Sequence, residues 1–344
     1  MKKTLAVIAF LLVPCGALSQ QSVDPPETLD PVGLKLLQIG NYREAADYYQ
    51  KILQNDHDDV QACRGYGTAL CRLGEGEKAL SAFRKCENMA PDNPYVFISR
   101  GRCYQDMGGR WNKLAESDFK NAIAIDPENP YAYNQLGIIY QSRDDHEQAI
   151  QYFQKAIQHE PSLYQVYNNL GVSLMETGRN KEAISAIQKA IRMADDLSGV
   201  YFYTNLGVAF LHAGMMEQAE ASFLMETAIN PDHLEAHLNL GNLYALSGRY
   251  SEAFWEYNRV LASDPDNGEA LVNLGAAYVL SDRPALARNT LLKAIELYPD
   301  SALAHHYLSA AYDRMGKEDE ARRFERKARE LGYQPDASPW PQPQ

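Results

Sequence analysis

Four similar segments of twelve residues occur in this chain. They read YNNLGVSLMETG, YTNLGVAFLHAG, HLNLGNLYALSG and LVNLGAAYVLSD at Tyr167–Gly178, Tyr203–Gly214, His237–Gly248 and Leu271–Asp282. The central glycines Gly171, Gly207 and Gly241 are 36 and 34 residues apart. Self-similarity at this period is typical of a repeat array, in which each unit packs only on its neighbours. An array of this kind can exceed the about 250–300 residues at which a single core stops growing, so 344 residues do not require two domains.

Each unit follows one pattern that predicts a pair of helices. The first helix carries a small residue at its middle and ends near a second glycine, and the second helix has an early Ala followed four positions later by an aromatic residue. A Pro-Asp or Pro-Glu then begins the next unit. Apolar residues four and one before the central glycine, and three after it, share one helical face. That face is the predicted core.

On this pattern the units resemble tetratricopeptide repeats. The positions that carry the resemblance in repeats 2 and 4 are Tyr66, Gly67, Leu70, Gly74, Ala79, Phe83 and Pro91, and Leu136, Gly137, Tyr140, Ala149, Phe153, Ala156 and Pro161. The resemblance implies an all-α, right-handed superhelical solenoid of nine helix pairs with a concave inner groove. The nine repeats are assigned to residues 26–59, 60–93, 94–129, 130–163, 164–199, 200–233, 234–267, 268–301 and 302–331.

The first nineteen residues have the pattern of an export signal. Lys2 and Lys3 precede a short apolar run, and small residues stand at the two positions that a signal peptidase reads before a cut after Ser19. We therefore expect a signal peptide over 1–19, a polar lead over 20–25, and a mature protein that is periplasmic or secreted. Cys15 offers an alternative, attachment to the membrane as a lipoprotein, although Pro14 is an unusual residue to precede a lipidated cysteine.

Four cysteines remain after removal of this segment, and an oxidising compartment would allow them to pair. Cys63 and Cys71 are eight residues apart on one predicted helix, or roughly 12 Å, which is too far for a disulfide. Cys86 and Cys103 fall on helices expected to pack together, so they form the favoured pair. Separate buried thiols are the alternative reading of all four.

The chain departs from the repeat pattern in three regions. Trp111 lies in a lengthened turn of repeat 3, where it either forms a binding anchor or folds back on the edge of the solenoid. Two inserted residues over 195–199, with Asp195 in place of the usual proline, suggest a bend between repeats 5 and 6. The charged helix from Glu318 reads as a terminal cap, and the Pro-rich tail over 332–344 is predicted to be unstructured.

A search for catalytic chemistry finds no motif with the required spacing. His146 and Glu147 lack the second histidine of a zinc protease, and no CxxC pair occurs. His233 and His237 are four residues apart, a spacing that allows both to contact one metal, but His237 stands at a core position. Glu226, where other repeats have Ala, is read as the result of a local rotation of its helix, with a perturbed buried carboxylate as the alternative. We therefore expect no enzyme activity, no metal and no cofactor.

A surface is the better candidate for function. On each first helix, the residues six, three and two before the central glycine, and one, four and five after it, form a stripe beside the core. In tetratricopeptide proteins this stripe lines the groove. Two before the glycine, repeats 5 to 8 always have asparagine, and apolar residues flank this ladder. The predicted partner-binding residues are Asn169, Asn205, Asn239, Asn273, Val208, Leu211, Leu238, Asn242, Leu246, Val272, Val279 and Leu280.

An asparagine amide both donates and accepts, so a regular ladder can pair with an extended peptide backbone whatever its sequence. The alternative is that asparagine is simply common at this position and that the tail of the chain fills the groove. In repeats 2 and 3 the same stripe is partly basic, and Arg64, Arg72 and Arg102 offer contacts to a carboxylate. Solvated arginines with no ligand are the alternative there.

The charge of the chain narrows the class of partner. A net charge of −12 disfavours nucleic acid and anionic membranes, because both are bound through clustered Lys and Arg. Repeat 6 contains no Lys or Arg, so a partner of the groove in repeats 6 to 8 should be apolar or basic. The sequence predicts a non-catalytic scaffold that binds a protein or peptide during assembly of an envelope or secreted complex. A targeting subunit of an enzyme complex and a self-associating structural protein remain alternatives.

Overall fold

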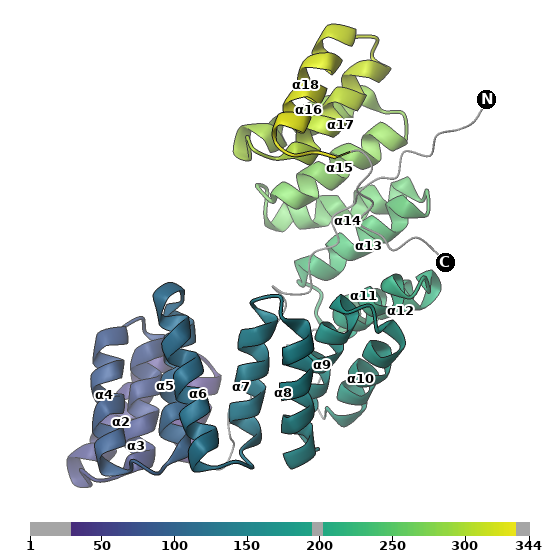
Figure 1. Ribbon diagram of the computed structural model, residues 1–344. Helices are drawn as coiled ribbons and strands as arrows, with labels where there is room; N and C mark the ends of the chain where they lie inside the picture. Colours follow the sequence, from purple (N-terminus) through teal and green to yellow (C-terminus); the bar gives the residue numbers. More distant parts are fainter. Residues whose placement is uncertain (1–28, 195–201, 335–344) are drawn as a thin grey trace. The chain divides into compact units, whose positions relative to one another are not determined.

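The computed structural model describes residues 29–194 and 202–334, and within them every regular element is helical (Figure 1). The chain divides into two compact units, described here as the N-terminal unit up to Ala194 and the C-terminal unit from Phe202. The N-terminal unit contains α1 (Pro31–Gln38), α2 (Tyr42–Asn55), α3 (Val60–Arg72), α4 (Gly76–Met89), α5 (Pro94–Met107), a 3-10 turn η1 (Gly109–Trp111), α6 (Asn112–Ile125), α7 (Pro130–Gln141), α8 (His146–His159), α9 (Tyr164–Glu176) and α10 (Asn180–Met193). The C-terminal unit contains α11 (Phe202–His212), α12 (Met216–Ile229), α13 (Leu234–Leu246), α14 (Tyr250–Ser263), α15 (Gly268–Leu280), α16 (Pro284–Leu297), α17 (Ala302–Arg314) and α18 (Glu318–Glu330).

Successive helices form nine pairs, as the repeat pattern predicted, so the all-α solenoid is confirmed. The close approach inside a pair depends on the central glycine of its first helix. A Cβ atom added at Gly241 of α13 would lie 2.5 Å from the ring of Tyr257 of α14, so only glycine fits against this buried ring. The second glycine ends the first helix: Gly248 has φ of 74°, a left-handed conformation that glycine adopts without a steric penalty. After α15 the same place is taken by Asp282, whose φ is 58°.

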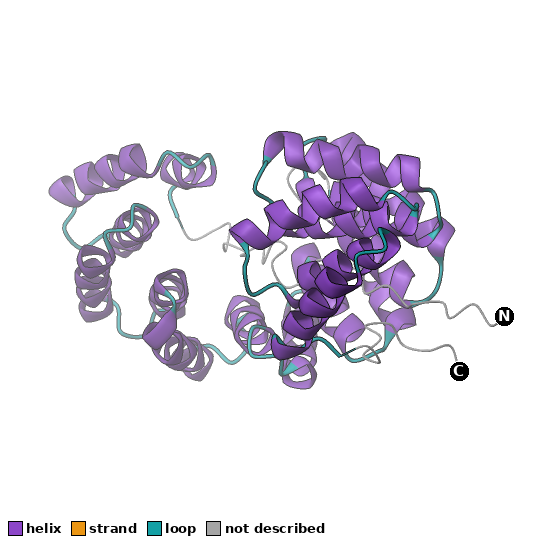
Figure 2. Cartoon of the chain, turned by 90° about the horizontal axis from the view of Figure 1, so that it is seen from above, coloured by secondary structure: helices purple, strands orange, loops and turns teal. Residues whose placement is uncertain are grey.

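The first helix of each pair lies on the inner side of its unit. The first helices of neighbouring pairs, such as α3 with α5 and α13 with α15, contact one another, whereas within the described ranges the second helices do not meet those of the next pair. Of the next pair in its unit, each described second helix contacts only the first helix, so the layers are closer together on the side of the first helices and curve toward that side. Figure 2 shows successive pairs of the N-terminal unit following one another along a curve. The stripe singled out on the first helices therefore belongs to the inner face of each unit.

Two disulfides hold α3, and they correct the predicted pairing. Cys63 is bonded to Cys86 of α4, and Cys71 to Cys103 of α5. The favoured pair of Cys86 with Cys103 is wrong, and so is the alternative of four separate thiols. A first helix packs both on its own second helix and on the first helix of the next pair, as well as on the pair before it. Two cysteines eight residues apart on α3 therefore meet different partners.

The remaining irregular features have simple structural roles. Trp111 in η1 stacks on Tyr104, with ring centroids 5.6 Å apart, so it folds back on the solenoid. Helix α18 buries Ala321 and Ala328 and presents its charges outward, as a terminal cap should. The predicted signal peptide over 1–19, the polar lead, the bend over 195–199 and most of the tail after Gly332 lie outside the described residues. Among the helices of residues 29–194 and 202–334, none combines the length and apolarity needed to cross a membrane.

Candidate functional site

The C-terminal unit brings together most of the predicted groove residues. Asn205 of α11, Asn239 of α13 and Asn273 of α15 occupy equivalent places on successive first helices and are at most 1% exposed. The apolar positions beside them form a continuous wall. Its buried members are Val208, Leu211, Leu238, Val272 and Val279, and Leu246 and Leu280 at the ends of their helices are half-buried. Asn169 of α9 belongs to the other unit, so the ladder of four is divided between the units.

The orientation of one amide in this group is determined by its donors. Asn242 Oδ1 accepts a hydrogen bond of 2.7 Å from the Tyr257 hydroxyl and one of 2.9 Å from Asn273 Nδ2. Two donors on one oxygen identify that atom as the carbonyl oxygen, so the amide nitrogen of Asn242 faces away from both of them. The contact also joins α13 to α15 across the repeat boundary. Asn273 of the ladder is thus tied through its side chain to the neighbouring repeat.

Other amide atoms of the ladder are buried without a partner. Both Nδ2 and Oδ1 of Asn239, which is fully buried, have no hydrogen-bond partner in the described part of the chain, and neither has Asn273 Oδ1. A buried polar atom left unpaired typically costs about 1–3 kcal/mol. Native proteins retain few such atoms, and those that remain call for an explanation such as a ligand site. The unpaired atoms are one donor and two acceptors, which is the chemistry of a peptide backbone.

Asn169 is held by the N-terminal unit in a different way. Its Nδ2 donates to Asn134 Oδ1 of α7 at 3.3 Å, and Gln141 donates to the Asn169 carbonyl oxygen at 3.4 Å. Gln141 also donates to the Ser173 hydroxyl at 3.1 Å. Asn169 is therefore tied to its neighbours along the chain, and its role as a ladder member stays a prediction.

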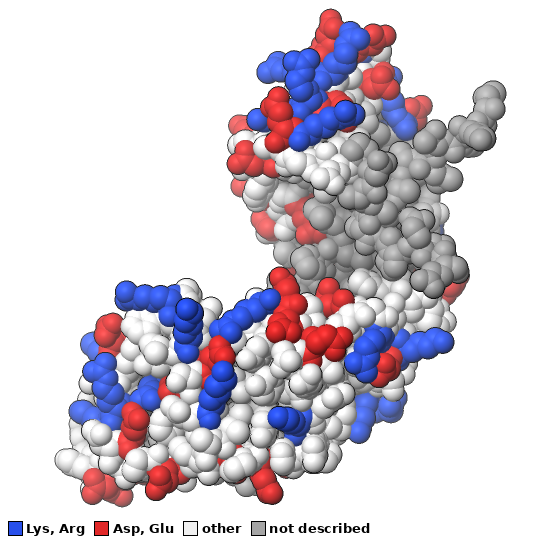
Figure 3. Space-filling view, viewed as in Figure 1, with Lys and Arg blue, Asp and Glu red and all other residues white. Residues whose placement is uncertain are grey.

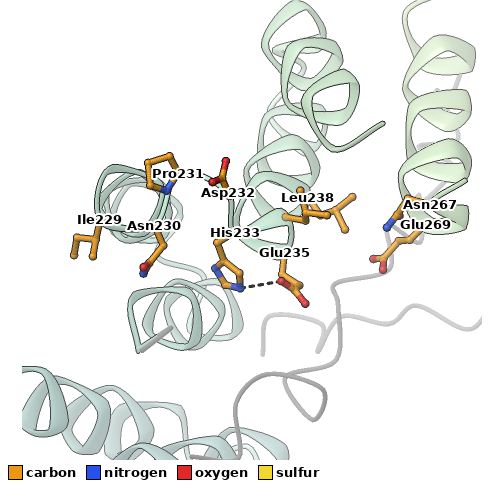
Figure 4. Close-up of a pocket in the computed structure, with 10 residues that line it drawn as sticks. Ile229, Asn230, Pro231, Asp232, His233, Glu235, Leu238, Asn267 and Glu269 are labelled. Atoms are coloured by element: carbon orange, nitrogen blue, oxygen red, sulfur yellow. Dashed lines mark ion pairs between the residues drawn. The ribbon is translucent and has the colours of Figure 1, made fainter. Parts of the chain in front are cut away.

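A pocket of about 560 Å³ lies beside the ladder in the C-terminal unit (Figure 4). It is formed where α12 passes into α13 and where α15 begins. Its lining residues are Ile229, Asn230, Pro231, Asp232, His233, Leu234, Glu235, Leu238, Asn267 and Glu269. Three of them are acidic, and Leu238 belongs to the apolar wall of the groove. The pocket and the ladder therefore share helix α13.

Two carboxylates of the pocket differ in their surroundings. Glu235 lies 2.8 Å from His233 Nε2, and the hydrogen bond from His233 lowers the pKa of that carboxyl. Glu269 has one carboxylate oxygen, Oε1, that is buried without a partner among the described residues. Burial, and secondarily the charge of Glu235, raise the pKa of Glu269 to about 7. Near neutral pH, Glu269 is a carboxyl that lacks a cation.

Glu235 and Glu269 are not among the groove residues predicted from sequence, although a signal for them is present. Glu235 and Glu269 stand six residues before Gly241 and Gly275, a position that the stripe includes. The recurrence of Glu at this position in consecutive repeats is visible without a structure. Their meeting in one pocket is not, because it depends on how α13 and α15 stack.

The histidines and the unusual glutamate of repeats 6 and 7 have structural partners. Glu226 is fully buried and accepts from the backbone N–H of Thr204 in the first turn of α11, while Asn230 donates to it at 2.6 Å. Burial raises the pKa of this carboxyl. The alternative of a perturbed buried carboxylate is thus the correct reading of Glu226, whose place is explained by capping. His237 lies between Glu256 (2.6 Å) and the carbonyl oxygen of Pro231 (3.0 Å), so its two ring nitrogens face these groups.

Of the predicted carboxylate contacts in the N-terminal unit, Arg64 is buried and Arg102 is half-buried, whereas Arg72 is exposed. Arg64 is 3% exposed and its guanidinium lies over the ring of Tyr95, while Arg72 forms an ion pair of 3.3 Å with Asp106. Burial lowers the pKa of Arg64 and of the half-buried Arg102 to about 10. The cavity that Arg72 and Arg102 help to line measures about 20 Å³, room for about one water molecule. The sequence prediction of a carboxylate site there stays untested.

Comparisons with known proteins place the repeats in one family. Models described as "Tetratricopeptide repeat" match residues 33–94, 130–163, 168–233, 269–301 and 290–323, and a model described as "TPR repeat" matches 241–281. Together they cover most of the chain.

Individual relatives are distant. The chain is 28% identical over 123 residues to anaphase-promoting complex subunit 6 of Arabidopsis thaliana, covering 36% of this chain and 22% of the relative. It is 33% identical over 81 residues to the Vi polysaccharide export protein VexE of Salmonella typhi, covering 22% of this chain and 12% of the relative. The crystal structure of the APC/C hetero-tetramer Cut9–Hcn1 superposes with a TM-score of 0.59 at 19% identity over 84% of this chain and 56% of that one. The chain thus matches less than a quarter of the length of either curated relative, and the likeness to the solved structure concerns the fold.

Proposed function

Since the chain belongs to the tetratricopeptide repeat family, whose fold is generally a non-catalytic scaffold for protein interactions, we propose that its C-terminal unit binds an extended segment of a partner protein along the inner face of α11, α13 and α15. The observation that carries this proposal is the pair of unpartnered, fully buried amide atoms of Asn239. A segment in extended conformation presents one N–H and one C=O per residue. Asn239 can donate to that C=O and accept from that N–H at once.

Asn242 and Asn273 support the same mode of binding. The Tyr257 hydroxyl fixes the amide of Asn242 before any partner arrives, so this side chain does not have to be ordered on binding. Asn273 adds an unpaired acceptor one repeat further along. Each hydrogen bond to the partner contributes only about 0.5–1.5 kcal/mol net, but pairing a buried amide also removes the cost of leaving it unsatisfied.

The apolar wall shapes the surface that a partner segment meets. Val208, Leu238 and Val272 recur at equivalent or neighbouring positions of α11, α13 and α15, so a partner segment meets apolar surface at each repeat. These side chains are only 3–5% exposed, so they add little apolar surface to be buried on binding and act through the shape of the wall. Backbone pairing therefore sets the register of the segment, and its side chains on the wall decide which segment is bound.

The site of action that we propose is outside the cytoplasm, in assembly of an envelope or secreted complex. The disulfides of α3 support this, because paired cysteines persist in oxidising compartments and are rare in the cytosol. The signal-like pattern of residues 1–19 supports it independently. One curated relative of part of the chain is an export protein, which agrees with the proposal without extending to this chain.

The test is capture of the partner by a variant with two ladder positions removed. We expect Asn205→Ala combined with Asn239→Ala to reduce capture of a partner from the native compartment at least several-fold, with the helical circular dichroism unchanged. Asn258→Ala is the matched control, because Asn258 is an exposed asparagine on α14. Capture by the double variant equal to that of the control would refute the ladder.

A further inference from the structure

The pocket of Asp232, Glu235 and Glu269 lies beside the ladder and has no part in pairing with a peptide backbone. We propose that this pocket receives the side chain of a lysine or arginine of the bound segment, with Glu235 and Glu269 on either side of its charged end. This inference rests on the proposed function, because it concerns one side-chain position of the segment that lies on Asn239.

The position of the pocket on α13 connects it to the ladder. Leu238 lines the pocket and precedes Asn239, whose unpaired amide is fully buried. Glu235 lies one helical turn before Asn239, so all three residues share one side of α13. Side chains of an extended segment point alternately to opposite sides of its backbone. A segment paired with Asn239 therefore has a side chain within reach of the pocket.

The shape and lining of the pocket suit a long cationic side chain. A volume of about 560 Å³ falls in the usual range for ligand pockets, roughly 300–1,000 Å³. Three lining residues, Ile229, Leu234 and Leu238, provide apolar surface for a methylene stem. The carboxylates of the same lining are available to its charged end. Lysine and arginine have this character, an apolar stem with a charged end. Figure 4 shows Glu235 and Glu269 projecting from α13 and α15 into the same space.

The charges around the pocket are those that select a cation. Glu269 Oε1 is buried and unpaired in the described part of the chain, and its nearest acidic neighbour Glu235 disfavours its ionised form. No Lys or Arg occurs in residues 202–248. Arg259 reaches the rim, where it donates to the Pro231 carbonyl oxygen at 3.1 Å. Figure 3 shows Lys and Arg gathering instead on the end of the C-terminal unit formed by α17 and α18.

A positional library of acetylated and amidated octapeptides tests the proposal, with fluorescence anisotropy on the full mature chain as the measurement. We expect selection of Lys or Arg at one position. Replacing that residue by norleucine, which keeps the stem without the charge, should weaken binding about five- to tenfold. In the Glu269→Gln and Glu235→Gln variants, the affinity of the basic peptide divided by that of the norleucine peptide should fall toward one. Glu217 is an exposed glutamate in the first turn of α12, and Glu217→Gln should leave this affinity ratio unchanged.

The outcomes separate this inference from the proposed function. Peptides that bind with no preference for a basic residue, or a norleucine ratio that Glu269→Gln leaves intact, would overturn the pocket while backbone binding stands. Absence of binding by every peptide would overturn both. Asn239→Ala provides the complementary result: it should weaken lysine and norleucine peptides equally, because it removes contacts to the backbone alone.

Discussion

The unpaired carboxyl of Glu269 makes a prediction about stability that needs no ligand. Its pKa is about 7, against an ordinary value of 4.5, so the folded chain binds this proton more tightly than the unfolded chain does. One pKa unit corresponds to 1.36 kcal/mol, so ionised Glu269 destabilises the folded chain by at most about 3 kcal/mol. Because part of the Glu269 side chain remains accessible to solvent, screening reduces the expected effect to about 1–2 kcal/mol.

The sign of the pH dependence follows from the raised pKa. Below pH 4.5 the carboxyl is protonated in both states and costs nothing; as the pH rises to about 7, folding retains a proton that the unfolded chain releases, and stability is lost. Above pH 7 the full cost is present. Glu269→Gln removes the ionisable group, so the variant should be more stable than the parent at pH 8 and equally stable near pH 4.

Hydrogen exchange of the amides in α13 and α15 is the suitable assay, because repeat arrays need not unfold in one step. Stabilisation should appear as slower exchange in these two helices at pH 8, after correction for intrinsic rates. Glu217→Gln is again the control and should give no pH-dependent gain. A Glu269→Gln variant with no gain at pH 8, or with the same gain at both pH values, would show that Glu269 carries no unpaired charge in the folded chain.

Three further predictions concern the framework. Reduction of the two disulfides should destabilise the N-terminal unit by about 3–4 kcal/mol for each loop, given sequence separations of 23 and 32 residues. Hydrogen exchange in the C-terminal unit should not change. An equal loss of protection in both units would contradict the local role of the disulfides. Gly241→Ala should cost about 1–3 kcal/mol in exchange protection of α13 and α14, because the new Cβ meets Tyr257, and wild-type protection would show that the ring can move aside. Asp282→Gly should raise the melting temperature slightly, by relief of about 1 kcal/mol of left-handed strain, and a lower melting temperature would mean that the ion pair with Arg314 outweighs it.

The sequence was sufficient to predict the structural features that recur in every repeat. A glycine such as Gly241 and an aromatic residue such as Tyr257 interact within one repeat, so their spacing alone predicts the helix pair. Contacts between repeats are less accessible from sequence. The partners of Cys63 and Cys71 depend on which of two neighbouring helices each side chain faces, and a comparison of spacing along one helix does not show this.

The candidate site, too, was only partly predictable from the sequence. Asn239 and its equivalents were recognisable as a stripe, since they occur at one position of each repeat. The unpaired amide atoms of Asn239 and Asn273 were not, because satisfaction of a buried polar atom depends on every neighbour around it. Glu269 acquires its raised pKa only where α15 stacks beside Glu235 of α13. Chemistry that arises between repeats requires the stacked structure.

The two bridges of α3 also determine how the chain responds to a pulling force. When both are closed, the shortest covalent path from Cys63 to Cys103 runs through Cys71 and its bonded partner, and the 32-residue stretch from Cys71 to Cys103 carries no load. At 3.3–3.6 Å per extended residue, this hides about 110 Å of contour length. A single molecule stretched from its ends should therefore lengthen by that amount when a reductant is added. The stretch between Cys71 and Cys103 therefore cannot be extended until its disulfide is reduced.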